Sequence, residues 1–285
     1  MPTSMRMRVP QASSGWVVLG CGVGMGMGYF LSTLTRCSSS RRKAMKDGRS
    51  LLSTHPSWTP GDKQLPPEGT GKGHARIDPR DLKSCYSLMI SSVVPRPIAL
   101  TSTQAPDGTV NCAPFSYFNT VGHDPPTLAV SVCRNGNGSK KDTLVNMLAS
   151  GEFVVNIMSD WFVEAANHTC GSFPPEVDEM KVAGLTPIQS TIVAPPRIKE
   201  SAVNMECKVR HTYDIVNSKG DITTTVVFGE VVMFHVFSHL LKENGAGEGK
   251  PTVNHEGFMP ISRLGGNTYG RLGSVFDIPR PRVGK

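Results

Sequence analysis

The chain has 285 residues, of which 38% are hydrophobic and 19% charged, so it is long enough for one large domain or two small ones. Its formal net charge is +7, but the basic residues gather at the start, where no acidic residue precedes Asp47. The remainder is close to neutral, which argues against a nucleic-acid partner. Seven cysteines, without any CxxC pair, argue against a disulfide framework and against a metal site such as structural zinc.

Residues 15–34 carry no charged side chain and are about as many as a helix needs to cross a bilayer. Basic residues flank this segment and are more numerous after it, which would leave the C-terminal part on the cytosolic side of a membrane. We therefore expect residues 1–37 to be a single-pass membrane anchor or a targeting segment. A mitochondrial presequence is the alternative, because the start lacks acidic residues and contains Arg and Ser.

Residues 38–73 are rich in Ser, Pro, Gly and Lys and show no hydrophobic periodicity. This composition predicts a flexible linker. The folded domain is expected to cover residues 74–281, and residues 282–285 are a basic tail.

Strand signals dominate the domain. Five apolar segments bounded by turn formers are predicted to be strands, and they cover residues 97–103, 127–133, 152–158, 203–215 and 222–237. The fourth alternates apolar and polar residues, which predicts a half-buried strand with Asn204 and Glu206 on its polar face. A turn at residues 217–220 joins it to the fifth as a hairpin. Helices are expected only at 140–150 and 161–167, so the sequence predicts an all-β barrel with a few helices.

The segment Asn111–Ser116 is the first candidate for chemistry. It follows a strand, and its proline predicts an irregular loop that exposes backbone groups with Asn and Ser side chains. A planar heterocycle with polar edges, such as a flavin ring, needs such donors and acceptors. An ordinary polar loop between strands is the alternative interpretation.

The second candidate is the segment Ser131–Thr143, in which a strand leads through a Gly/Asn loop into a helix. Ser139 and Asp142 have the spacing of a capping box. A helix N-terminus suits a phosphate, and basic side chains such as Lys140 could complete its surroundings. An ordinary capped helix with solvated lysines and no ligand explains this segment equally well. The loop matches neither a Walker A motif nor a dinucleotide GxGxxG motif.

Seven short motifs resemble, in order and spacing, the flavin reductase-like, FMN-binding split-barrel family over residues 76–280. They are VPRPIAL (94–100), NCAPFSYFN (111–119), DPP (124–126), KDT (141–143), GEFVVN (151–156), AGLT (183–186) and ES (200–201). The resemblance implies a six-stranded Greek-key split barrel that forms a homodimer, with FMN at or near the subunit interface.

The resemblance also implies a set of cofactor-binding residues. The flavin ring would be lined by residues 111–116, and the phosphate would be held by Ser131, Arg134, Lys141 and Thr143. The full predicted set is Arg96, Asn111, Ala113, Pro114, Phe115, Ser116, Asn119, Ser131, Arg134, Lys141, Asp142 and Thr143. Positive charge from Arg96 near the ring would favour reduced, anionic flavin.

The segment Arg263–Arg271 resembles a signature of one branch of the family. It would close over the flavin or its substrate pocket, or serve as a surface clasp for a terminal strand. His255 and Tyr269 are the candidates for contacting a substrate, whereas His168 and Cys170 are expected to be structural.

The implied activity is NAD(P)H-dependent reduction of flavin, with electrons passed to free flavin, a partner oxygenase or a small acceptor. FMN is favoured over FAD because the segment offers a single phosphate cradle. The flavin would carry the chemistry, so no protein acid, base or nucleophile is required. A non-catalytic FMN-binding sensor or flavin-storage module is the alternative, and a haem or pyridoxal-phosphate protein is a weaker one.

Overall fold

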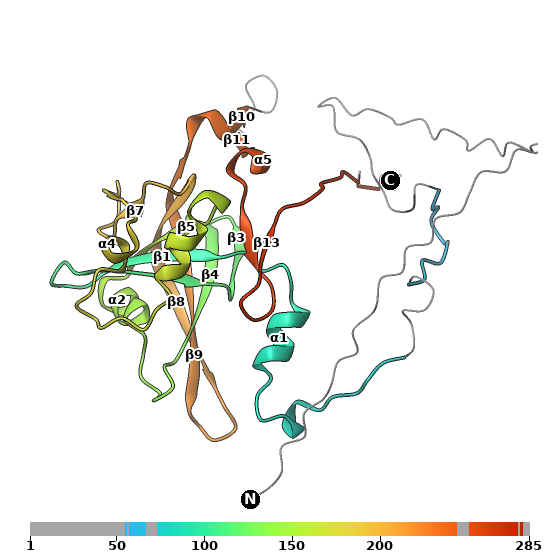
Figure 1. Cartoon of the computed structure of the whole chain (residues 1–285), viewed down its shortest axis with the longest axis horizontal. Coiled ribbons are helices and arrows are strands. Elements are labelled where there is room, and N and C mark those ends of the chain that lie inside the picture. The colour runs from blue at the N-terminus through green and yellow to red at the C-terminus, as the bar shows by residue number, and fades with distance from the viewer. Residues whose placement is uncertain (1–54, 56, 67–72, 244–250, 279, 282–285) are drawn as a thin grey trace, which may run out of the picture. The chain divides into compact units, whose positions relative to one another are not determined.

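The computed structural model describes residues 55, 57–66, 73–243, 251–278 and 280–281 (Figure 1). The chain divides into two units after Leu51, and all described residues belong to the second unit, residues 52–285. The predicted segment 1–37, most of the predicted linker 38–73 and the tail 282–285 lie outside the described residues.

The prediction of a membrane-associated protein is wrong for the part of the chain that the structure describes. No helix there is both long and apolar enough to cross a bilayer. Residues 15–34, on which the prediction rested, lie outside the described residues, as does the start of the chain behind the mitochondrial alternative. The localisation is therefore corrected, because nothing that the structure describes supports a membrane anchor.

The described chain is mostly β-structure with short helices. In chain order the elements are η1 (Pro79–Asp81), α1 (Tyr86–Ser92), β1 (Ala99–Gln104), β2 (Val110–Phe115), β3 (Phe118–His123), β4 (Pro126–Cys133), α2 (Asp142–Ser150), β5 (Glu152–Ile157), η2 (Asp160–Phe162), α3 (Val163–His168), α4 (Glu179–Ala183), β6 (Pro187–Ile188), β7 (Arg197–Ile198), β8 (Val203–Val216), β9 (Ile222–Val236), η3 (Ser238–Leu240), β10 (Leu241–Glu243), β11 (Pro251–Val253), α5 (His255–Phe258), β12 (Ile261–Arg263) and β13 (Tyr269–Arg271). The five predicted strands and both predicted helices are confirmed within two residues at each end.

Seven of the strands form one antiparallel sheet in the order β2-β1-β5-β8-β9-β4-β3, one strand more than the six expected. Its longest strands, β8 and β9, form the predicted hairpin and run side by side (Figure 1). The edges of the sheet are β2 and β3.

The apolar core consists of two clusters. One joins β4, β5, β8 and β9 to α2 through side chains that are fully buried, among them Phe153, Leu144 and Met147. The other packs β1 and β2 against α3 and α4 and contains Leu100 and Met180. The short helices thus bury their apolar faces on the sheet and hold its β2 side in place.

The expectation of a loop at residues 111–116 is wrong. All of β2 pairs with β1, and Pro114 lies opposite Leu100 in the ladder. A proline is tolerated here because β2 is an edge strand, so its missing N–H group is not needed by a second neighbour.

Two further local expectations are corrected. Lys141, not Ser139, is the N-cap residue of α2, and the Ser139 hydroxyl donates instead to Asn137 Oδ1 at 2.7 Å. The polar face of β8 is not solvent-facing at its start, where Asn204 and Glu206 are 3% and 0% exposed. The reason is that the loop after β6 covers this part of the strand and donates backbone N–H groups to Glu206.

Candidate functional site

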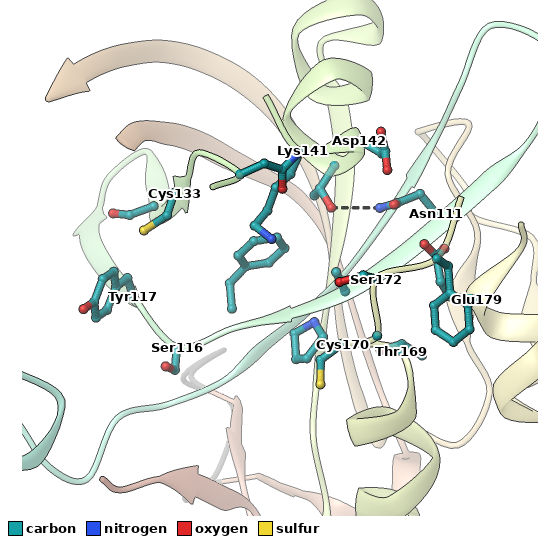
Figure 2. A pocket seen from close by; sticks show the side chains of 18 of the residues that line it. Asn111, Ser116, Tyr117, Cys133, Lys141, Asp142, Thr169, Cys170, Ser172 and Glu179 are labelled. Atoms are coloured by element: carbon teal, nitrogen blue, oxygen red, sulfur yellow. Dashed lines mark hydrogen bonds between the residues drawn. The ribbon is translucent and has the colours of Figure 1, made fainter. Parts of the chain in front are cut away.

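A cavity of about 420 Å³ opens between β2, β4, the start of α2 and residues 169–173 (Figure 2). We call it the β2–α2 cavity. Nine of the predicted cofactor-binding residues line it, namely Asn111, Ala113, Pro114, Phe115, Ser116, Ser131, Lys141, Asp142 and Thr143. The fold therefore brings the two candidate segments of the sequence to one place.

Asn111 ties β2 to α2. Its side-chain Nδ2 donates to Thr143 Oγ1 at 2.8 Å and to Thr103 Oγ1 at 3.3 Å. Asn146 Nδ2 donates to the same Thr103 oxygen at 3.2 Å. Asn111 and Thr143 are 6% and 2% exposed, so this network fixes the corner where the strand meets the helix.

The start of α2 forms part of the cavity wall, through Lys141, Asp142 and Thr143. No side chain caps the helix at Lys141, so its first N–H groups are not satisfied by a capping oxygen. Lys141 itself is exposed and lines the cavity. On the neighbouring strand β4, Ser131 and Cys133 line the cavity, whereas Val130 and Val132 point into the core.

Arg134 and Asn119 do not line the cavity. The Arg134 guanidinium lies 3.6 Å from Asp214 of β8, and its buried Nη1 has no hydrogen-bond partner. Asn119 Oδ1 accepts from the backbone N–H of Thr120 at 2.8 Å. Of the predicted phosphate ligands, Ser131, Lys141 and Thr143 are therefore together, and Arg134 is separate from them.

Arg96 lies behind the cavity wall and acts as a clamp. Its guanidinium donates to the carbonyl oxygens of Ile90, Val93 (2.7 Å) and Leu264 (2.7 Å), and its Nε lies 3.4 Å from Ser116 Oγ. Ile90 and Ser116 both line the cavity, although Arg96 does not. The side chain is thus engaged in joining α1 and the C-terminal hairpin to the end of β2.

Several further residues that line the cavity were not among the predicted cofactor-binding residues. They are Tyr86 and Ile90 of α1, Tyr117, Cys133, Asn135, residues 169–173 and Glu179. Glu179 is 6% exposed, and burial raises its pKa. Burial also raises the pKa of Tyr117. These residues come from separate elements, so only the fold brings them together.

Neither His255 nor Tyr269 lines the β2–α2 cavity. His255 lines a cavity of about 200 Å³ with Asp160 and Arg271, and its buried Nε2 has no hydrogen-bond partner. The Tyr269 hydroxyl donates to Asn167 Oδ1 at 2.7 Å, and the ring packs under the Arg263 guanidinium at 4.5 Å. Of the two expected structural residues, His168 packs against Phe173, whereas Cys170 lines the β2–α2 cavity.

The family model described as "Flavin reductase like domain" matches residues 90–258 of the chain. This span includes the nine cavity-lining residues from the two candidate segments.

Three solved structures resemble the chain over nearly their whole length. Component B of nitrilotriacetate monooxygenase from Bacillus cereus is 36% identical with a TM-score of 0.67, covering 72% of this chain and 99% of that chain. The 2-nitrobenzoate 2-nitroreductase NbaA from Pseudomonas fluorescens is 31% identical with a TM-score of 0.63, covering 73% and 96%. A split-barrel protein from Shewanella frigidimarina, 18% identical with a TM-score of 0.59 and covering 69% and 91%, shares the fold. The expected split-barrel fold is confirmed.

Proposed function

The chain belongs to the flavin reductase-like family, and we propose that it is an NAD(P)H-dependent flavin oxidoreductase that binds FMN in the β2–α2 cavity. The observation that carries this proposal is the joining of the β2 segment, the start of α2 and Lys141 in one cavity. A volume of about 420 Å³ lies within the range of cofactor pockets.

The donor set of the cavity fits a flavin with one phosphate. The wall of β2 offers apolar surface from Pro114 and Phe115 together with polar groups, which suits a flat ring with polar edges. The open start of α2, with Lys141 and the hydroxyl of Ser131, suits a phosphate. A single cradle of this kind favours FMN over FAD.

Bound FMN would supply the hydride and electron chemistry, for which reduced nicotinamide is the proposed donor. The residues of this chain would bind and orient. Asn111 holds β2 against α2, and the Arg96 clamp holds α1 and Ser116 at the cavity wall. These contacts keep the lining in one arrangement before a ligand arrives, which limits the ordering that binding requires.

The proposed electron acceptor is a partner oxygenase, a small molecule or free flavin. The Bacillus cereus structure at 36% identity is a monooxygenase component, which supports an oxygenase partner. The Pseudomonas fluorescens structure at 31% identity is a nitroreductase, which supports a small acceptor.

We also propose that the chain forms a homodimer. The edge strand β3 and the end of β9 expose Val121 and Phe234, which are 53% and 54% accessible beside a cavity of about 740 Å³. Apolar surface of this kind marks an interface. Sedimentation velocity of the full chain tests this directly, and a monomer at micromolar concentration would refute it.

The test of the proposed function is an anaerobic titration of the purified full chain, loaded with FMN, by NADH and by NADPH. We expect the visible flavin absorption to bleach within seconds with one nucleotide, which also identifies the donor. A yellow protein that ignores both nucleotides would support the sensor or storage alternative. A protein that cannot be loaded with FMN would refute the proposal.

Replacing Lys141 with alanine should weaken FMN binding about 10- to 100-fold, because a charge-assisted contact contributes about 1.5–3 kcal/mol. The matched control is Lys140→Ala, which removes the same charge one residue earlier and outside the cavity lining. Quenching of flavin fluorescence measures both dissociation constants. Equal losses in the two variants would show that general surface charge, and not contact with Lys141, binds the phosphate.

A further inference from the structure

Glu179 is a buried carboxyl in the wall of the β2–α2 cavity. It is the first residue of α4, is 6% exposed and lines the cavity beside Asn111 and Asp142 (Figure 2). Among the described residues no Lys, Arg or His forms an ion pair with it, and no cation contributes to the shift of its pKa. A buried charge without a partner is costly, so its presence at this place calls for an explanation.

The architecture explains why an oxygen acceptor stands at Glu179, but not why that side chain carries a charge. Oε2 accepts the backbone N–H of Cys112 at 2.9 Å. That N–H belongs to the edge strand β2, beyond which no further strand can accept it. A glutamine at this position would accept the same N–H group without a buried charge, so the hydrogen bond alone does not require a carboxyl.

The groups that face Glu179 favour its protonated form. Burial is the main cause of its raised pKa, and the carboxylates of Asp142 in α2 and of Asp178, the N-cap residue of α4, add to it. From β2 the N–H of Cys112 acts in the opposite sense, while the Cys112 thiol is itself kept neutral by burial. Lys141 is the cation of the cavity lining, and it is exposed at the start of α2.

A phosphate-bearing ligand would add negative charge to this cavity and displace its water. The repulsion between like charges strengthens as water leaves, because the effective dielectric constant falls. An ionised Glu179 would therefore oppose an anionic ligand, whereas a protonated Glu179 would not.

We propose that Glu179 determines the cavity's response to ligand charge, and that binding of FMN is coupled to partial uptake of a proton from solvent by the Glu179 carboxylate, largest at the pH values where Glu179 ionises. This inference rests on the proposed function, since it concerns the same cavity. It distinguishes FMN from riboflavin, which has the same ring but no phosphate. The affinity for FMN should fall as Glu179 ionises, and the affinity for riboflavin should change little.

The experiment measures dissociation constants of FMN and riboflavin for the full chain between pH 5.5 and 8.5. The wild type is compared with Glu179→Gln, which keeps the acceptor for Cys112, and with Glu176→Gln, the same change at an exposed residue of the preceding loop. We expect FMN to bind Glu179→Gln about tenfold more tightly than the wild type at high pH and equally at low pH. A tenfold effect corresponds to a rise of about one unit in the Glu179 pKa on binding. Because the wild type and the variant are compared at the same pH, ionisation of the FMN phosphate affects both dissociation constants equally.

Riboflavin should show a difference below about twofold, and Glu176→Gln should behave as the wild type. Calorimetry in two buffers of different ionisation enthalpy should show greater proton uptake by the wild type than by Glu179→Gln. If Glu179→Gln does not fold, Asp142→Asn replaces it and should shift the pH dependence to lower pH. If the wild type and Glu179→Gln both bind FMN and the ratio of their dissociation constants does not change with pH, the inference is overturned but the proposed function stands. A wild type that binds neither flavin refutes the proposed function and the inference together.

Discussion

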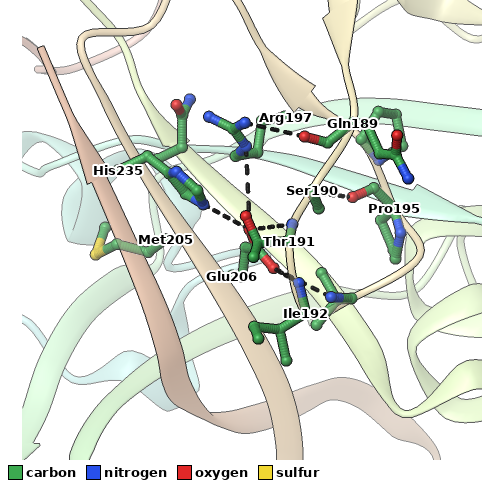
Figure 3. A network of polar contacts seen from close by, with 12 residues as sticks. Gln189, Ser190, Thr191, Ile192, Pro195, Arg197, Met205, Glu206 and His235 are labelled. Atoms are coloured by element: carbon green, nitrogen blue, oxygen red, sulfur yellow. Dashed lines mark hydrogen bonds and ion pairs between the residues drawn. The ribbon is translucent and has the colours of Figure 1, made fainter.

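Replacing Glu206 with glutamine should lower the free energy of unfolding by about 3 kcal/mol. Glu206 is fully buried, and its carboxylate accepts three backbone N–H groups in the loop after β6, from Thr191 (2.7 Å), Ile192 (2.6 Å) and Val193 (3.1 Å) (Figure 3). His235 Nε2 lies 2.6 Å from the same carboxylate. A glutamine would turn an NH₂ group toward donors and leave at least one of them unsatisfied.

The loss should depend on pH. Burial by itself would raise the pKa of Glu206, but the backbone N–H groups and His235 outweigh it and hold the pKa below its ordinary value of 4.5. A lowered pKa in the folded state stabilises the fold above the pKa of the unfolded chain. That stabilisation disappears as the pH falls through the folded-state pKa, so the difference between wild type and Glu206→Gln should shrink below about pH 4.5.

Urea unfolding at pH 7 and at pH 3.5 measures both effects. The matched control is Glu230→Gln in the same hairpin, where Glu230 pairs with Arg210, a side chain that is 61% exposed. Glu230 itself is 20% exposed, but its partner reaches solvent, so we expect this pair to contribute about 1 kcal/mol, less than the Glu206 network. If Glu206→Gln and Glu230→Gln lose the same free energy of unfolding, the buried hydrogen bonds of Glu206 add no stability beyond that of a surface ion pair.

Replacing Gly229 with alanine should lower the free energy of unfolding by about 2–3 kcal/mol. A Cβ atom at Gly229 would lie 2.3 Å from Cζ and 2.6 Å from Cε1 of Phe153, well inside van der Waals contact. Phe153 is fully buried in the core between β5 and α2, so its ring has little room to move.

A double-mutant cycle tests the cause. Phe153→Leu removes the atoms that the new methyl group would meet, so the double variant should be more stable than the sum of the two single losses predicts. Gly136→Ala is the control, because a Cβ there meets nothing within 4 Å and should change stability by less than about 0.5 kcal/mol. If the losses of unfolding free energy from Gly229→Ala and Phe153→Leu are additive, the contact with Phe153 is not the cause of the destabilisation by Gly229→Ala.

Five strands were predictable because each leaves a local pattern, whereas β2 was not, because its proline indicated a loop. The hairpin of β8 and β9 follows from alternation and a turn, and the start of α2 from a Gly/Asn loop after a strand. Two main segments of the β2–α2 cavity were predictable, because each of them, residues 111–116 and residues 131–143, is a continuous motif in the sequence.

Other features depend on distant contacts and leave no local pattern. Glu206 occupies a polar position of an alternating strand, yet a loop from another part of the chain covers it. Arg96 was expected near the ring, but three carbonyl oxygens, including that of Leu264, take its donors. Glu179 reaches the cavity because α4 packs on β2, a contact that neither segment indicates by itself.

The edge formed by β2 leaves few donors for another strand. Along β2 the N–H of Cys112 is taken by Glu179, and Pro114, two residues further on and so on the same side of the strand, has no N–H group. A strand approaching this edge from another molecule would find carbonyl oxygens but few donors, and could not extend the ladder as amyloid-like assemblies do. The residues that line the cavity therefore also protect this edge against aggregation, which leaves β3 as the edge of the sheet that is free to pair.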